Sequence, residues 1–212
     1  SVKGIAYREN DNLKANPPRP LINDLDGIDF PAWHLFSNYE KYSFRKFPRA
    51  LTTFMITSRG CPYQCIYCTK LIHGSHIRLR SVDNVMDEIN YLMERFKIGE
   101  IHVYDDNFTL YPERVKEICT RIISKKYKNL RFALPGGIRA DKGDREMFQL
   151  MAKAGFYWIG FGVESGSQEV QNKVKHNLDL HKAKETIKLA QEAGIYVHAQ
   201  FMLGLPFDTL AT

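Results

Sequence analysis

The stretch Arg59-Gly60-Cys61-Pro62-Tyr63-Gln64-Cys65-Ile66-Tyr67-Cys68 places three cysteines in a Cys-x3-Cys-x2-Cys pattern. Three thiolates this close together can converge on one metal centre, and the segment supplies no fourth cysteine. An iron–sulfur cluster with three protein ligands keeps one iron open to a small molecule. The stretch follows an apolar run at residues 51–56 and precedes a helical pattern. We therefore expect it where a strand hands over to a helix, which is where sites lie in alternating β/α folds.

This cysteine spacing, with an aromatic residue directly before the last cysteine, resembles the signature of the radical S-adenosylmethionine (SAM) enzymes, and Tyr67 occupies the aromatic position. The resemblance implies a [4Fe–4S] cluster held by Cys61, Cys65 and Cys68, which are then both metal ligands and catalytic. It implies that SAM binds the open iron and is cleaved reductively to a 5′-deoxyadenosyl radical, which reacts with a substrate that the sequence does not identify. It also implies an electron donor such as flavodoxin or ferredoxin.

Two alternatives for the cysteines stay open. Three cysteines completed by His73 or His76 form a legitimate structural zinc site, and the chain would then be a non-catalytic binding module. A branch of the radical SAM family that transfers sulfur to tRNA is the other alternative, although it requires a further cluster domain that this sequence does not contain. The colour of the protein separates iron–sulfur from zinc.

The composition is that of an ordinary globular domain. The chain has 212 residues, of which 44% are hydrophobic and 25% charged, and this length supports one domain with a sizeable core. No apolar run approaches the ~20 residues that span a bilayer, and no signal peptide is visible. The net charge of +6 is dispersed, which favours a solvated surface over a nucleic-acid interface. Clustered cysteines indicate a reducing, cytoplasmic location.

Residues 1–48 differ from the rest of the chain and predict a linker, whereas residues 49–212 predict the catalytic core. The run Ala15-Asn16-Pro17-Pro18-Arg19-Pro20 cannot be helical. The segment resembles the connector between a cobalamin-binding domain and a radical SAM domain in one branch of the family, which includes methyltransferases and a tetrapyrrole ring cyclase. Cobalamin would then be bound by a domain outside this chain.

Strand-like and helix-like patterns alternate from Leu51 onward, which indicates an α/β fold with a parallel sheet. We expect strands at 51–56, 101–104, 130–134, 157–163 and 195–203. Helices are expected to start after Ser81 and at Pro112, to end near Gly99 and Gly155, and to cover 180–193. Five strands suit the family's partial (β/α)6 TIM-like barrel, truncated at its C-terminal end in an excised fragment.

The ends of the expected second and third strands carry polar residues. Asp105, Asp106 and Asn107 follow the second strand, and the resemblance implies that this segment contacts the amine of SAM. The alternative is a surface turn. Arg139 follows the third strand, and its guanidinium suits a carboxylate of SAM or of the substrate. A structural ion pair with Asp141 or Asp144 is an equal alternative.

The expected fourth and fifth strands end in further candidates for SAM contacts. Glu164 and Ser165 follow glycines that let a ligand approach the backbone, and they resemble the family's ribose-binding motif. The backbone near Met202 and Leu203 resembles the segment that packs on adenine. Gln200 and Phe207 replace a glycine and a glutamate found there in many members, so no side-chain role follows at this strand.

Overall fold

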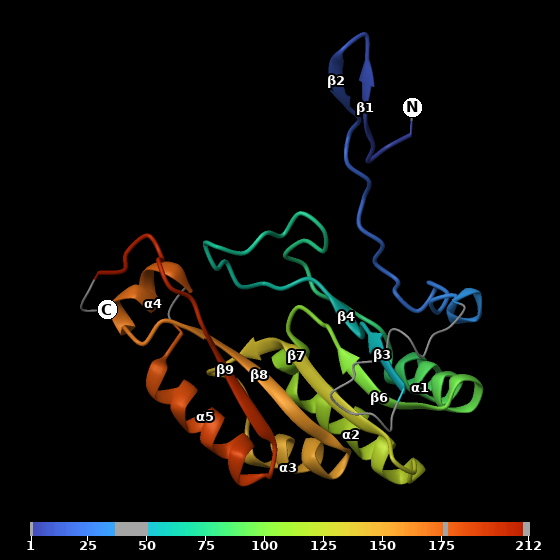
Figure 1. The fold of residues 1–212 in the computed structure, drawn as a ribbon, viewed down its shortest axis with the longest axis vertical. Coiled ribbons are helices and arrows are strands. Elements are labelled where there is room, and N and C mark those ends of the chain that lie inside the picture. Colours follow the sequence, from blue (N-terminus) through green and yellow to red (C-terminus); the bar gives the residue numbers. More distant parts are fainter. Residues whose placement is uncertain (1, 37–50, 176–177, 210–212) are drawn as a thin grey trace.

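A five-stranded parallel sheet forms the centre of the computed structural model, which describes residues 2–36, 51–175 and 178–209 (Figure 1). Its strands are β3 (Leu51–Met55), β6 (Ile98–Val103), β7 (Arg131–Arg139), β8 (Phe156–Glu164) and β9 (Tyr196–Phe201). Strands that follow one another in the chain are neighbours in the sheet, in the order β3-β6-β7-β8-β9, and every pairing is parallel. The predicted α/β fold is confirmed, with five strands of the expected partial barrel.

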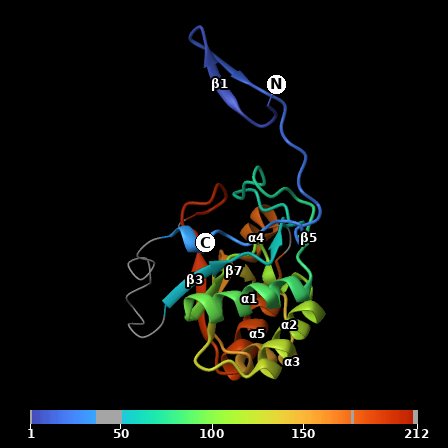
Figure 2. The ribbon, with the colours of Figure 1, turned by 90° about the vertical axis from the view of Figure 1, so that its right-hand side faces the viewer.

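Helices connect these strands and cover one face of the sheet. They are α1 (Val82–Phe96), α2 (Pro112–Lys125), α3 (Arg145–Lys153), α4 (Gln168–Val174) and α5 (Leu180–Glu192). Figures 1 and 2 show α1, α2, α3 and α5 along the same side, with α4 near the end of β8. The opposite face carries no helix within the described residues. None of the helices in this part of the chain is long and apolar enough to cross a membrane.

Helix α1 illustrates why these segments fold as they do. The Ser81 side chain accepts a hydrogen bond from the Asn84 backbone N–H at 3.1 Å, which is the expected N-cap. Its apolar positions three and four residues apart are buried against the sheet. The predicted end at Gly99 is wrong, because Lys97 takes the left-handed conformation (φ 55°) that ends the helix. Gly99 lies in β6 instead.

The ends of two strands differ from those expected, and one helix was not expected. Strand β7 continues to Arg139, with a register irregularity between Leu134 and Ile138, so Arg139 lies at the strand end and not in a following loop. Strand β9 ends at Phe201, which places Met202 and Leu203 just beyond it. Helix α4 was not predicted, because a helix of 7 residues gives too short an apolar pattern to stand out.

The core between sheet and helices is built from the inward-facing side chains of both layers. Phe132, Phe156 and Phe161 from the strands meet Phe148 and Met151 of α3 there, each at most 2% exposed. The rings of Phe132 and Phe156 stack at 4.9 Å. Fully burying one such side chain stabilises the fold by about 1.5–3 kcal/mol, so this layer fixes β7 and β8 against α3.

The N-terminal segment is partly packed on the core. Strands β1 (Ala6–Glu9) and β2 (Asn12–Ala15) form an antiparallel hairpin that stands apart from the sheet in Figure 1. Further along, the Arg78 guanidinium donates to the Ile22 carbonyl at 2.7 Å, and the Asp26 carboxylate accepts from the Ser81 N–H at 2.9 Å. This part of the expected linker is therefore attached to the base of α1. The boundary predicted at residue 48 lies outside the described residues.

Candidate functional site

The cysteine-bearing loop, residues 60–77, is closed at its base by a short antiparallel pair. Strand β4 (Ser58–Arg59) pairs with β5 (Arg78–Leu79), just before α1. Gly60 sits at this base with a φ of 95°, and a Cβ atom there would collide with the His76 carbonyl oxygen, so only glycine fits. The loop thus lies between a strand and a helix as predicted, with an additional pair of strands that the sequence did not reveal.

All four cysteines are free thiols. Cys61 and Cys65 are half-buried and Cys68 is exposed, whereas Cys119 is buried in α2, as expected for a core residue. Burial raises the pKa of the Cys61 thiol. Within the described residues, no three His, Cys, Asp or Glu side chains are gathered as a metal-ligand set. The loop nevertheless provides three accessible soft ligands on eight residues, and this donor set fits an iron–sulfur cluster.

Asp105 fastens the end of β6 to the start of the cysteine segment. It is buried, and its carboxylate accepts hydrogen bonds from the Thr57 N–H, from the Thr57 hydroxyl at 2.6 Å and from the Ser58 hydroxyl at 2.6 Å. Burial raises the pKa of this carboxyl group. Both oxygens are engaged inside the protein, so Asp105 holds the end of β6 to Thr57 and Ser58. Its contact with SAM stays a prediction.

Replacing Asp105 by alanine is expected to lower the free energy of unfolding by about 3 kcal/mol, because three buried donors lose their acceptor. Urea unfolding followed by circular dichroism measures the change. Asp106→Ala is the matched control, since the neighbouring side chain is 34% exposed, and we expect a clearly smaller loss for it. Equal losses for the two variants would contradict the positioning role of Asp105.

Asp106 and Asn107 face different surroundings. The Asp106 carboxylate accepts from the Gly60 N–H at 2.7 Å and lies 2.9 Å from His73 Nδ1, so it links the start of the cysteine loop to its second half. Asn107 is buried, and its side-chain oxygen has no hydrogen-bond partner among the described residues. A buried polar atom without a partner is costly, which makes Asn107 a candidate for contact with a bound group.

Tyr67 brings the cysteine loop to the end of β8. Its ring packs against Val170, Val174 and Leu205. Burial raises the pKa of its hydroxyl, and the adjacent Glu164 carboxylate and Cys65 thiol raise it further. Two predicted site residues and one predicted cluster ligand, from segments about 100 positions apart in the chain, are therefore neighbours in space, as a shared sheet edge requires.

Glu164 has an unusual backbone. Its φ is 72°, a conformation that non-glycine residues rarely adopt and that persists where the surroundings impose it. The Gln171 amide donates to the carbonyls of Val163 and Ser165, on either side of Glu164. The Lys175 ammonium group lies 3.0 Å from the Glu164 carboxylate, and both side chains are largely buried. These contacts fix where the carboxylate points.

A cavity of about 220 Å³ opens beside Glu164, at the ends of β8 and β9. Its lining includes four of the predicted residues, namely Glu164, Ser165, Met202 and Leu203. The Met202 N–H donates to the Glu164 carbonyl at 2.9 Å, so the two strand ends are tied together. The structure thus brings the ribose-binding and adenine-binding candidates into one cavity.

Arg139 has its partners inside the protein. Its guanidinium makes two contacts with the Asp141 carboxylate, at 2.6 and 3.1 Å. It also donates to the Lys175 carbonyl at 3.1 Å and lies 4.2 Å from the centre of the Tyr63 ring. The structural ion pair with Asp141, one of the two alternatives, is the arrangement observed. The contact between the Arg139 guanidinium and the Tyr63 ring therefore joins the end of β7 to the cysteine loop.

Sequence reasoning missed two residues that shape this site, Gln171 and Lys175. Gln171 carried a usable signal, because it is a polar residue beside Val170 and Val174 on the buried face of α4. Lys175 carried none, since its contact with Glu164 depends on the turn after β8. Gln200, which replaces a family glycine, donates to the Pro135 carbonyl at 3.2 Å and so joins β9 to β7.

Comparison with known proteins identifies the family. A profile of the Radical SAM superfamily matches residues 55–212. The chain belongs to the radical SAM superfamily. Members of this superfamily bind a [4Fe–4S] cluster and SAM, so the membership favours the iron–sulfur interpretation of the cysteine loop over the zinc alternative.

Known relatives can be aligned with almost the whole of this radical SAM chain. It is 34% identical to the cytidylyl-2-hydroxyethylphosphonate methyltransferase of Streptomyces wedmorensis, over 97% of this chain and 43% of the relative. It is 28% identical to the anaerobic magnesium-protoporphyrin IX monomethyl ester cyclase of Cereibacter sphaeroides, over 100% of this chain and 34% of the relative. The chain thus spans less than half the length of these curated relatives.

A solved structure shares the architecture of this radical SAM domain. The cobalamin-dependent SAM radical enzyme OxsB, determined with aqua-cobalamin and SAM bound, superposes with a TM-score of 0.75 and 25% identity. The match covers 94% of this chain and 29% of that one. This chain therefore shares its fold with OxsB.

Proposed function

We propose that the protein is a cobalamin-linked radical SAM enzyme that cleaves SAM reductively for a methyl transfer or cyclisation. One observation carries this proposal: Tyr67 of the cysteine loop is a neighbour of both Cys65 and Glu164, and Glu164 lines a cavity at the ends of β8 and β9. Cluster ligands and a nucleoside-sized cavity are what such a reaction must bring together. The relatives named above support the choice of methyl transfer or cyclisation.

The three loop cysteines would hold a [4Fe–4S] cluster, which would supply the electron for the reductive cleavage of SAM. The other residues of this chain would position the cysteine loop and shield it from water. Asp106 holds the loop through the Gly60 N–H and His73. The Arg139 guanidinium packs on the ring of Tyr63, which belongs to the same loop. Tyr67, half-buried among apolar side chains, limits the access of water to Cys65.

The residues that contact SAM are proposed from the same geometry. Glu164 would accept hydrogen bonds from the ribose hydroxyls, with Ser165 beside it. The backbone at Met202 and Leu203 would line the adenine. Asn107, with its buried and unpartnered oxygen, is the candidate for the amine of SAM, together with Asp106. Asp105 holds the segment that presents them.

Further features of the whole protein are also proposals. A reductant such as flavodoxin or ferredoxin would supply the electron, and a separate domain would bind cobalamin, as the cofactor of OxsB suggests. A cytoplasmic location is supported by four free thiols, three of them accessible to solvent. The substrate stays unassigned, because one fold serves many reactions in such families.

Turnover of SAM tests the proposed function. The intact protein is reconstituted anaerobically with iron and sulfide, reduced with dithionite and incubated with SAM. We expect 5′-deoxyadenosine and methionine as products, measured by liquid chromatography, or methyl transfer when a methyl acceptor and cobalamin are present. A reconstituted protein that carries the cluster, yet neither consumes SAM nor binds it, would overturn the proposal.

A further inference from the structure

The turn that presents Glu164 at the end of β8 is strained. The Ser165 N–H donates to the carbonyl of Val163, two residues earlier, at 3.0 Å, which closes a γ-turn around Glu164. The φ of 72° at Glu164 makes this the rare form of γ-turn, whose central residue lies at positive φ. A glutamate keeps such a conformation only where the surrounding contacts impose it. Those contacts therefore decide how the carboxylate is presented to the cavity.

Gln171 of α4 makes two contacts of this kind. Its side chain is fully buried, and its amide donates to the carbonyls on both sides of Glu164, those of Val163 and Ser165. One planar amide group thus holds both ends of the strained turn at a fixed spacing. Among the residues that the structure describes, the side-chain oxygen of Gln171 has no partner. Gln171 therefore acts on the turn through its N–H groups.

The helix that carries Gln171 is itself attached to the cysteine loop. At the end of α4 the Val174 carbonyl accepts a hydrogen bond from the Ile66 N–H of the loop at 3.0 Å. The ring of Tyr67 packs against Val174 as well. Figure 1 shows α4 near the end of β8. Because α4 is fixed to the loop on one side, it can hold the turn in its strained form on the other.

Lys175 and Gln171 act on different parts of the turn. The Lys175 ammonium group lies 3.0 Å from the Glu164 carboxylate, so it sets the charge around the tip of that side chain. The hydrogen bonds of Gln171 go to the main chain, so they set the point from which the side chain starts. A shift of the main chain moves the whole carboxylate, and small errors in the position of a binding group are costly.

We propose that Gln171 is a positioning residue for SAM, which holds the γ-turn and so aims the Glu164 carboxylate at the ribose hydroxyls without touching SAM itself. This inference rests on the proposed function, in which Glu164 accepts hydrogen bonds from the ribose. Methionine at position 171 would keep the length and flexibility of the side chain and remove both donors. The strained turn would then relax, and the carboxylate would move from its place beside the cavity.

A double-mutant cycle on the intact, reconstituted protein tests this role. Equilibrium dialysis measures the SAM affinity of the wild type, Gln171→Met, Glu164→Gln and the double variant, and iron analysis verifies the cluster. We expect Gln171→Met to weaken SAM binding about tenfold, as relaxation of a strained site residue implies, with the iron content unchanged. The double variant should bind SAM no worse than Glu164→Gln alone, because a residue that acts through Glu164 has no effect once the carboxylate is gone. Circular dichroism verifies folding, and Gln171→Leu replaces Gln171→Met if the methionine variant does not fold.

Gln168→Met is the matched control on the same helix. The Gln168 amide also binds the main chain, since it donates to the Leu178 carbonyl at 2.9 Å and accepts from the Leu180 N–H at 3.0 Å. These partners lie outside the turn at Glu164. We therefore expect Gln168→Met to lower the melting temperature and to leave the SAM affinity unchanged.

The outcomes distinguish this inference from the proposed function. Unchanged SAM affinity in Gln171→Met, an equal loss in Gln168→Met, or additive losses in the double variant would each overturn the role of Gln171. Failure of both Gln171 variants to fold would overturn it as well, because the residue would then be structural. If Glu164→Gln weakens SAM binding in any of these cases, only the inference about Gln171 fails. A wild-type protein that carries the cluster and binds no SAM would overturn both.

Discussion

Replacing Cys65 by alanine is expected to abolish cluster assembly. A cluster with three protein ligands cannot lose one without losing most of its affinity, and the described part of the loop offers no fourth thiol to replace Cys65. After anaerobic reconstitution we expect the iron content to fall to background and the visible absorption near 400 nm to disappear. Production of 5′-deoxyadenosine should fall by at least three orders of magnitude, because the radical cannot form without the electron that the cluster supplies. Cys61→Ala and Cys68→Ala should behave alike.

Cys119 provides the matched control for this experiment. It is the fourth free cysteine, buried in α2 and remote from the loop in sequence. Cys119→Ala should therefore retain iron and activity and show only a modest loss of stability from the small cavity left in the core. A Cys119 variant that loses iron as completely as the loop variants would contradict the assignment of the ligands. So would a Cys65 variant that retains a full cluster.

Replacing Glu164 by glutamine is expected to weaken SAM binding by one to two orders of magnitude while the cluster stays intact. A carboxylate accepts hydrogen bonds from two ribose hydroxyls, and a hydrogen bond to a charged group contributes about 1.5–3 kcal/mol. The amide keeps the size of the side chain but loses the charge and one acceptor. Equilibrium dialysis with labelled SAM measures the affinity, and iron analysis on the same sample verifies the cluster.

The competing explanation is that Glu164 serves only its ion pair with Lys175, 3.0 Å away. In that case Glu164→Gln would lower the melting temperature and leave the SAM affinity of the folded protein unchanged. Glu169→Gln is the matched control, since Glu169 lies on α4 and forms an exposed ion pair with Lys173. Exposed pairs contribute little to stability, so neither SAM binding nor melting should change measurably in this variant.

The parts of the fold that depend on local sequence were predictable. The cysteine spacing, the Ser81 cap and the Pro112 start each act within a few residues, and each appears where expected. The same holds for the alternation of strands and helices, because each element buries a face that its own periodicity defines. The prediction that the helix ends near Gly99 was wrong, because Lys97 adopts the left-handed conformation that glycine usually supplies.

The contacts that give site residues their roles were not predictable, because they join distant segments. The sequence presents Asp105 as a candidate for SAM contact, and it gives no sign of the hydrogen bond to Asp105 from Thr57, 48 positions earlier in the chain. The ion pair of Arg139 with Asp141 was also one of two open alternatives in the sequence. The direction of the Arg139 side chain depends on the irregular register between β7 and β8, which the sequence does not reveal. Packing decides such choices, and a single sequence does not record them.

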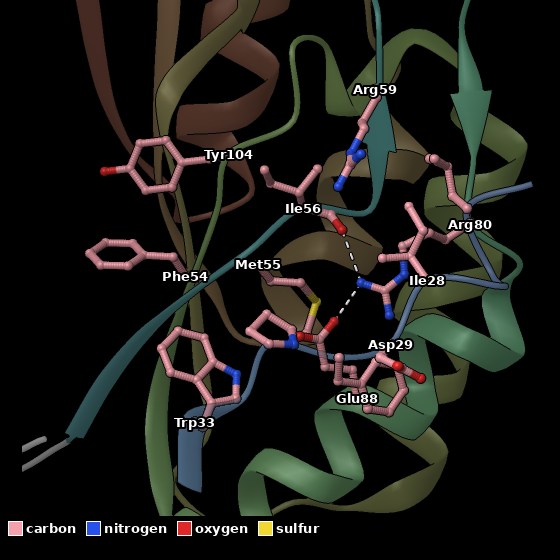
Figure 3. Close-up of a pocket in the computed structure, with 13 residues that line it drawn as sticks. Ile28, Asp29, Trp33, Phe54, Met55, Ile56, Arg59, Arg80, Glu88 and Tyr104 are labelled. Carbon is pink, nitrogen blue, oxygen red and sulfur yellow. Dashed lines mark hydrogen bonds and ion pairs between the residues drawn. The ribbon is translucent and has the colours of Figure 1, made fainter. Parts of the chain in front are cut away.

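A pocket at the β3 edge of the sheet makes the same point for the N-terminal segment. Its composition, rich in proline and turn residues, predicted a linker, and nothing local distinguished Trp33 from an exposed aromatic residue. In the structure this segment supplies one wall of the pocket, facing Phe54 and Tyr104 (Figure 3). A segment predicted as a connector can therefore also form the wall of a pocket.

Binding of SAM at an open iron is tested most directly by paramagnetic resonance of the reconstituted, reduced protein, recorded with and without SAM. We predict a [4Fe–4S]⁺ signal whose shape changes when SAM is added and which is missing from Cys65→Ala. A protein that takes up zinc in equimolar amount and shows no cluster signal would contradict this prediction. A cluster signal that SAM leaves unchanged would contradict it as well.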